Sequence, residues 1–575
     1  MGLIHRKDAG TSVARLPSPQ SSGDEKVVGG ADHGPDILDS PETGLHRGLR
    51  SRQITMIAIG GAIGTGLIIG TGSSLAKAGP LSILISYSIV GFIVYMVMCA
   101  LGEMATYLPI QSGFTGYAAR FCDPALGFSL GYTYWFKYII VTPNQLTAAA
   151  LVIQYWVPRE KVNPGVFIAV FLVAIVLINY LGIKFFGEIE FWLSSIKVLT
   201  IVGLLILSLV LVLGGGPDHD RKGFRYWKNP GAMKTLYGTG DTGRFLGLWS
   251  TFVTATFAYL GTELVGVTVG EAQNPRRVIP RAIKLTFWRI VVFYVLSVLL
   301  IGMLVPYNSP RLAFATKKAT TGASASPFVV AMIESGISGL PGFLNACILI
   351  FVFSAANSDL YIATRTLYGL AKEGNSARIF ARTDRRGVPI YALGLSAAIA
   401  CIAFLNVADD SRKVFTYFVN LVTIFGLLTW ISILVTHIYF VKARRAQGIE
   451  KHQLAYTAPF GLYGTYFALV FCIVIAIFKN FDVFIHVPDR EGGENFDYVN
   501  FITGYLGIPL YLGMIFGYKL LNPKTKGWTP MTADLYSGKA AIDREEEEFL
   551  ANKAAKQSGG KSGGWFYRTF IGWLL

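Results

Sequence analysis

Long apolar stretches alternate with short polar ones along most of the chain. Helices of roughly 20 apolar residues are long enough to cross the ~30 Å hydrocarbon core of a bilayer. Twelve stretches satisfy this, at residues 54–77, 81–107, 125–155, 165–182, 188–213, 246–271, 283–306, 341–371, 388–406, 413–441, 462–485 and 499–521. The pattern therefore predicts an all-α integral membrane protein with twelve transmembrane helices.

The composition supports this prediction and adds the domain organisation. Hydrophobic residues make up 52% of the 575 residues and charged residues 15%, whereas soluble proteins carry roughly 25% charged residues. Residues 1–50 are polar and rich in Ser, Gly and Pro. We expect a disordered cytoplasmic N-terminal segment at 1–50, a twelve-helix transporter domain at 51–522 and a cytoplasmic C-terminal tail at 523–575.

The net charge of +16 has two interpretations, nucleic-acid binding and basic cytoplasmic loops. Lys and Arg gather in the loops after the sixth, eighth and tenth spans, whereas the loop after the eleventh span is acidic. Positive loops face the cytoplasm. This distribution favours a membrane protein with both termini in the cytoplasm and no nucleic-acid partner, although the basic residues of loop 214–245 depart from the rule.

The first span contains a run of glycines at Gly60, Gly61, Gly64 and Gly66. Each glycine inside a helix costs about 1 kcal/mol relative to alanine. A helix broken in mid-membrane explains them, because the second half then begins with free N–H groups and a positive dipole end that can hold a carboxylate. A dinucleotide-binding loop would need a preceding strand, and close helix packing accounts only for the later glycines such as Gly70.

A second interruption appears five spans later, where residues 257–266 place a Gly-Thr pair and Glu263 inside an apolar helix. Two broken helices at equivalent positions of consecutive five-helix units indicate an inverted-repeat transporter with its site at the membrane midplane. We therefore expect a 5+5 inverted repeat with broken helices 1 and 6 plus two extra helices. The rival architecture of two six-helix halves requires a long central loop, and the loop after the sixth span is short.

The residues of these segments resemble a known family. Residues 60–72, the segment 257–280 with its Gly-Glu-Ala-Gln-Asn-Pro-Arg run, and residues 354–361 with Arg365 and Tyr368 are similar to the fungal amino acid permeases of the amino acid–polyamine–organocation superfamily. Residues 142–156, 214–227 and 543–548 are similar to its dicarboxylic amino acid permease branch, which takes up glutamate and aspartate. The resemblance implies proton-coupled import at the plasma membrane, driven by the proton gradient without a cofactor.

The broken helix and the resemblance together suggest the substrate-binding residues. We expect the backbone N–H groups of Gly64, Thr65 and Gly66 to hold the α-carboxylate. Phe257 occupies the family position of an aromatic lid over the substrate; ordinary packing is the alternative. Gln145 stands where permeases for basic and many neutral amino acids generally carry glutamate, so it would avoid repelling an acidic side chain; a hydrogen bond to a neighbouring helix is the alternative.

Charged residues inside spans are costly and suggest function. In related bacterial members, a lysine matching Lys197 sits where sodium-coupled relatives bind an ion, so Lys197 either couples transport to protons or tethers the first span. Glu263 either handles protons or bridges helices. Glu103 and Lys137 are expected near span ends, where snorkelling, a structural pair and function all remain open; Lys137 could also add positive potential to the substrate site.

Other functional classes fit less well. An enzyme would need a cluster of nucleophiles or titratable groups, and His437 stands alone in its span. A general or neutral amino acid permease and an amino-acid sensor remain alternatives. The predicted partners are the amino acid substrate, the lipid bilayer and, by family habit, ubiquitination and trafficking machinery at the tails. The acidic run at 545–548 is expected to be solvated. No metal ligand set is predicted.

Overall fold

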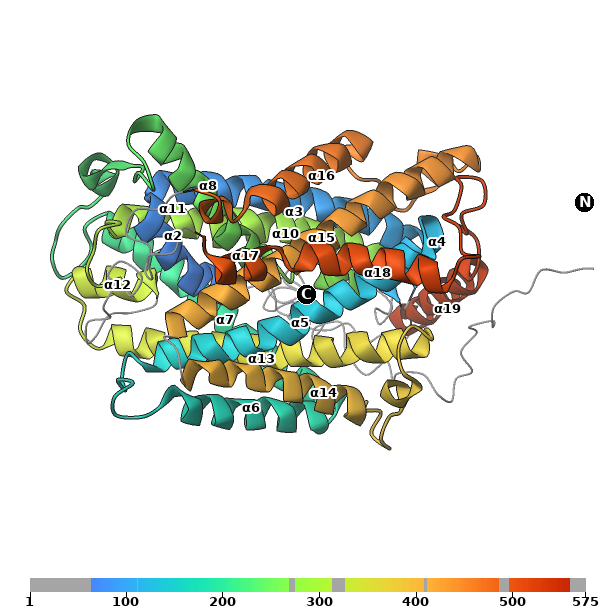
Figure 1. The fold of residues 1–575 in the computed structure, drawn as a ribbon, viewed down its shortest axis with the longest axis horizontal. Helices are drawn as coiled ribbons and strands as arrows, with labels where there is room; N and C mark the ends of the chain where they lie inside the picture. Colours follow the sequence, from blue (N-terminus) through green and yellow to red (C-terminus); the bar gives the residue numbers. More distant parts are fainter. Residues whose placement is uncertain are drawn as a thin grey trace, which may run out of the picture. The chain divides into compact units, whose positions relative to one another are not determined.

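The computed structural model describes residues 64–110, 112–267, 275–312, 326–407, 411–485 and 496–558. All the elements of regular structure in these ranges are helices, and long helices running side by side dominate the fold (Figure 1). The N-terminal segment 1–50, the first half of the first predicted span and residues 559–575 lie outside the described residues.

Seven helices of the described residues are long and apolar enough to cross a membrane. Three of them are α3 (Pro80–Tyr107), α5 (Pro124–Ile153) and α7 (Ile183–Val212). Two more are α13 (Leu340–Lys372) and α15 (Ser411–Ala446). The sixth comprises α10 (Pro275–Arg289), η4 (Ile290–Val295) and α11 (Leu296–Leu304), and the seventh contains α16 (Gly461–Phe478).

Further apolar helices are shorter or bent. The chain forms α6 (Pro164–Tyr180), and α14 (Ile390–Ala400) continues into η6 (Cys401–Val407). The pair α17 (Tyr498–Tyr505) and α18 (Gly507–Leu521) bends by 44°. From residue 81 onward, each predicted span therefore overlaps a helix. Short helices connect them: α4 (Gly113–Phe121), η2 (Trp227–Gly231), α12 (Pro327–Glu334), η5 (Arg378–Ala381), η7 (Lys451–Gln453) and η8 (Phe481–Val483).

Burial separates inner from outer helices. The most apolar stretch of α5 is 89% buried and that of α15 is 83% buried. The helix α5 packs against both α13 and α15. The most apolar stretches of the spans containing α7 and α16 are only 39% and 33% buried. Large apolar side chains such as Leu199 and Tyr463 point outward from these two helices. Apolar outer faces of this extent require an apolar surrounding, as a bilayer provides.

The segment after α18 is bound to the helical domain. The Trp528 indole donates to the Ala119 carbonyl over 2.7 Å, and the Trp528 backbone N–H donates to the Cys122 carbonyl over 2.8 Å. In α19 (Lys539–Ser558), Asp543 and Glu546 both form ion pairs with Arg276 of α10. The prediction of a solvated acidic run is therefore wrong for Glu546, because the partly buried Arg276 of α10, distant in the sequence, pairs with it.

Candidate functional site

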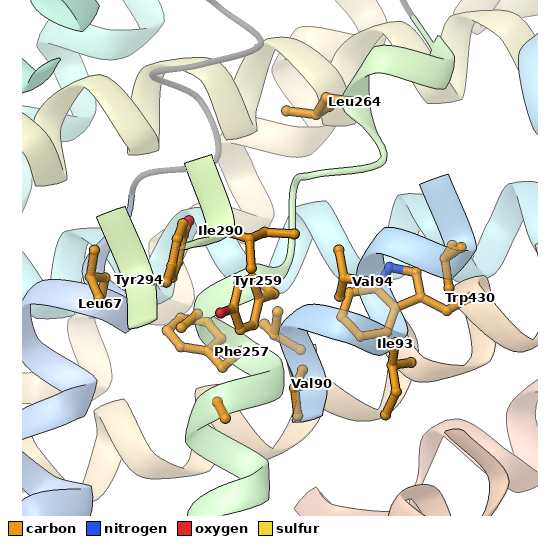
Figure 2. Close-up of a cluster of buried hydrophobic side chains, with 14 of the residues drawn as sticks. Leu67, Val90, Ile93, Val94, Phe257, Tyr259, Leu264, Ile290, Tyr294 and Trp430 are labelled. Carbon is orange, nitrogen blue, oxygen red and sulfur yellow. The ribbon is translucent and has the colours of Figure 1, made fainter. Parts of the chain in front are cut away.

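The predicted interruption of the sixth span is present. The helix α8 (Gly240–Tyr259) ends at Tyr259, Leu260 is extended and Gly261 has φ of +92°, a conformation that glycine adopts without strain. The chain becomes helical again at α9 (Leu264–Val267). Figure 2 shows this unwound segment running between the end of α8, which bears Phe257 and Tyr259, and Leu264.

The described part of the first span begins beside this break. The chain is helical in η1 (Gly66–Gly70) and continues as α2 (Thr71–Ala78). A Cβ atom added at Gly66 would overlap the backbone of Ala258 in α8, whereas one added at Gly64 would meet no atom of the described residues within 4 Å. Glycine at position 66 therefore permits backbone contact between this part of the first span and α8, and the described residues leave open space beside Gly64.

Tyrosines fasten the two segments to each other. The Tyr87 hydroxyl donates to the Gly66 carbonyl over 3.2 Å, and the Tyr259 hydroxyl donates to the Tyr87 carbonyl over 2.9 Å. The Tyr259 ring stacks on that of Tyr294, with ring centroids 4.5 Å apart (Figure 2). Tyr259 thus has a packing and bracing role.

Both polar atoms of the Gln145 side-chain amide form hydrogen bonds to other elements. Its Oε1 atom accepts a hydrogen bond from the Thr65 hydroxyl over 2.9 Å, and its Nε2 atom donates to Asp359 Oδ2 over 3.2 Å. The chain Thr65–Gln145–Asp359 therefore links the start of the first described helix to α5 and α13. The structure confirms that Gln145 bonds to other elements, and it places a carboxylate beside it.

Lys137 and Glu263 are brought together. Lys137 lies in the middle of α5, so the expectation that it sits near a span end is wrong. Its ammonium group forms an ion pair with Glu263, and both side chains are buried. The Glu263 carboxylate also accepts from the Gly261 backbone N–H over 3.2 Å and from the Trp430 indole over 3.3 Å. The pair holds the unwound segment against α5 and α15, which favours a structural pair for Lys137 and helix bridging for Glu263.

Lys197 lies in a second buried polar cluster, between α7 and α13. Its Nζ atom is 3.9 Å from Glu190 Oε1, and both side chains are fully buried. Glu190 also accepts hydrogen bonds from Ser354 over 2.5 Å and from Ser194 over 3.3 Å. Ser194 and Lys197 follow Glu190 by four and seven residues and so share its helix face. Lys197 is therefore balanced by a nearby carboxylate.

Phe257 lines a cavity of about 240 Å³ next to the break. Its ring lies edge-on to that of Phe415, with centroids 6.1 Å apart, and its side chain is buried. Lys77 and Lys479 are the cationic side chains of the cavity wall. Phe257 thus lies in the wall of this cavity close to the break, and its role as an aromatic lid stays a prediction. Glu103, in α3, accepts from the Ala458 backbone N–H over 2.8 Å and has His437 3.5 Å away, which favours a structural pair.

Similarity to known proteins decides the family. The family model for amino acid permeases matches residues 53–531. The chain belongs to the amino acid permease family. It is 54% identical to the dicarboxylic amino acid permease of Saccharomyces cerevisiae, over 94% of this chain and 88% of that protein. It is 40% identical to the lysine-specific permease of that yeast, over 87% of this chain and 79% of the relative. It is also 39% identical to the general amino-acid permease of the same yeast, over 89% of this chain and 84% of that protein.

Membership of this family makes the chain a multi-pass membrane transporter of amino acids and not an enzyme. Two charged residues close to the predicted site, Glu190 and Asp359, were not among the site residues predicted from the sequence. The sequence contains a feature that could have identified each of them. Glu190 precedes Lys197 by two helical turns on one face, and Asp359 is an acidic residue inside the apolar run 341–371.

Proposed function

We propose that this permease imports L-glutamate and L-aspartate across the plasma membrane by proton symport. The observation that carries the proposal is the 54% identity, over 94% of the chain, to a permease whose name gives dicarboxylic amino acids as its substrates. We further propose twelve membrane spans arranged as a 5+5 inverted repeat with two extra helices, and both termini in the cytoplasm. The apolar helices and the break between α8 and α9 support this arrangement.

The proposed binding site lies where the two interrupted segments meet. The N–H groups of Gly64, Thr65 and Gly66 receive the α-carboxylate, because they stand where helical structure begins. The open space at Gly64 leaves room for this group. Gln145 faces the substrate side chain, held in place by Thr65. Phe257 covers the substrate from the cavity side.

We assign proton coupling to Lys197. Glu263 contributes by changing its ion pair with Lys137 when the unwound segment moves. A fully buried lysine can change protonation state during a transport cycle more readily than an exposed one, because burial penalises its charged form. Glu190 supplies the opposing charge when Lys197 is protonated. Glu263 binds the backbone at Gly261, so movement of the break would alter its pairing with Lys137.

Uptake measurements test the proposal. The chain is expressed in cells lacking their own amino acid permeases, and radiolabelled glutamate uptake is measured at pH 5 and pH 7, with a protonophore and with a panel of competing amino acids. Strong competition by aspartate and loss of accumulation with protonophore are expected. Equal competition by neutral amino acids would instead indicate a general permease, and substrate binding without uptake would indicate a sensor.

A further inference from the structure

The carboxylate beside Gln145 creates an electrostatic problem for an acidic substrate. Gln145 was expected to leave the side-chain site without a negative charge, yet its amide donates to Asp359 over 3.2 Å. A side-chain carboxylate that binds Gln145 must come close to Asp359. Two ionised carboxylates in a site of low dielectric repel each other strongly, and one then takes up a proton.

The charges around Asp359 do not resolve this conflict. The charged and titratable groups acting on it are Lys137, Tyr134 and Tyr138 from α5, and Glu190 and Lys197 from α7. Lys137 is paired with Glu263, and Lys197 is beside Glu190. The hydrogen bond that the structure gives Asp359 comes from the neutral amide of Gln145.

Lys137, Lys197, Glu190, Glu263 and Asp359 form one cluster of charged residues. Its charge balance identifies the residue that must change its protonation state when glutamate binds. With both lysines protonated, their charges cancel those of the Glu190 and Glu263 carboxylates, so an ionised Asp359 leaves one net negative charge. Bound glutamate adds another negative charge, because its ammonium and α-carboxylate groups cancel and its side-chain carboxylate remains. One proton on Asp359 lowers the total from two negative charges to one, which is the charge of the cluster before glutamate binds.

We propose that Asp359 is a proton-binding residue specific for acidic substrates, so that the permease takes up one proton more with glutamate than with a neutral amino acid. The proton converts the Asp359 carboxylate into a carboxyl group, whose O–H donates to the substrate's side-chain carboxylate alongside the Gln145 amide. When the substrate leaves on the opposite side, Asp359 releases the proton there. This inference rests on the proposed function and assigns the discrimination of charge to a residue other than Lys197.

The test compares glutamate with glutamine, its neutral isostere, in cells expressing the full chain. KM for glutamate and the inhibition constant for glutamine are measured from pH 5 to pH 8. In the wild type, KM for glutamate is expected to rise about tenfold per pH unit above the pH at which Asp359 loses its proton, and the glutamine constant to rise less steeply. In Asp359→Asn, which imitates the protonated state, the two profiles should become parallel.

Matched variants make the result specific. Glu103→Gln removes another buried membrane carboxylate, in α3, and should keep the difference between the two amino acids. Asp359→Glu retains a titratable group and should shift the midpoint of the glutamate profile while keeping its slope. This variant decides the question if Asp359→Asn does not reach the cell surface.

Several results would overturn the inference. These are parallel glutamate and glutamine profiles in the wild type, a difference that persists in Asp359→Asn, and an unshifted midpoint in Asp359→Glu. An Asp359→Asn protein at the surface that neither exchanges nor binds glutamate would also overturn it, because asparagine imitates the binding-competent state. A wild-type protein that takes up no glutamate would instead refute the proposed function.

Discussion

Replacing Gln145 with glutamate would place a second carboxylate against Asp359. The substituted oxygen would stand where Nε2 now donates, 3.2 Å from Asp359 Oδ2. At an effective dielectric near 20, two ionised groups at that separation repel by roughly 5 kcal/mol. The two residues would therefore share one proton and carry one negative charge between them.

The consequence for transport depends on the substrate. A side-chain carboxylate bound 4–5 Å from the shared charge would meet roughly 3–4 kcal/mol of repulsion before screening. Since about 1.4 kcal/mol corresponds to a factor of ten, we expect uptake of glutamate and aspartate by Gln145→Glu to fall at least tenfold. Uptake of serine or alanine, which carry no side-chain charge, should fall much less.

The assay is initial uptake of the four amino acids at equal surface expression. Gln145→Met serves as the matched control, because it removes the amide donor without adding charge. It should impair glutamate uptake less than Gln145→Glu does. Equal losses for all four substrates, or no loss for any, would show that Gln145 does not distinguish substrate side chains by charge.

Four other substitutions test the remaining assignments. Gly64→Val should abolish uptake at normal surface expression, because the open space at Gly64 would be filled where the α-carboxylate binds; normal transport would refute this. Lys197→Met should eliminate accumulation driven by a pH gradient while exchange of internal for external substrate continues, and unchanged acid-stimulated accumulation would leave Lys197 a structural role. Lys137→Met or Glu263→Gln alone should destabilise the detergent-solubilised protein by about 3–5 kcal/mol, since each leaves a buried charge unpaired. In thermal denaturation, the double variant should recover part of this loss of stability. Losses that simply add in the double variant would contradict the pairing.

The helices and one break could be predicted because local sequence determines them. A run of apolar residues long enough to span a bilayer has few alternatives to a helix. Gly261, with its positive φ, interrupts such a run at the predicted place. The first break could be compared only from Gly64 onward, where the helical structure begins near the expected residue.

The partners of the site residues could not be predicted in this way. Gln145 and Asp359 are 214 residues apart, and Lys137 and Glu263 are 126 residues apart. Hydrophobic periodicity does not say which face of α5 meets α13 and which meets the unwound segment. For this reason the charge of Lys137 could be identified from the sequence but its neutralisation could not.

The backbone contact between Gly66 and Ala258 limits how the permease can move. With no side chain at position 66 to act as a spacer, a shift of η1 toward α8 would produce immediate overlap. Tyr87 of α3 opposes separation, because its hydroxyl donates to the Gly66 carbonyl and its own carbonyl accepts from the Tyr259 hydroxyl of α8. We therefore expect η1 and α8 to move together as one rigid unit during transport, with flexibility confined to the segments that join this unit to the surrounding helices.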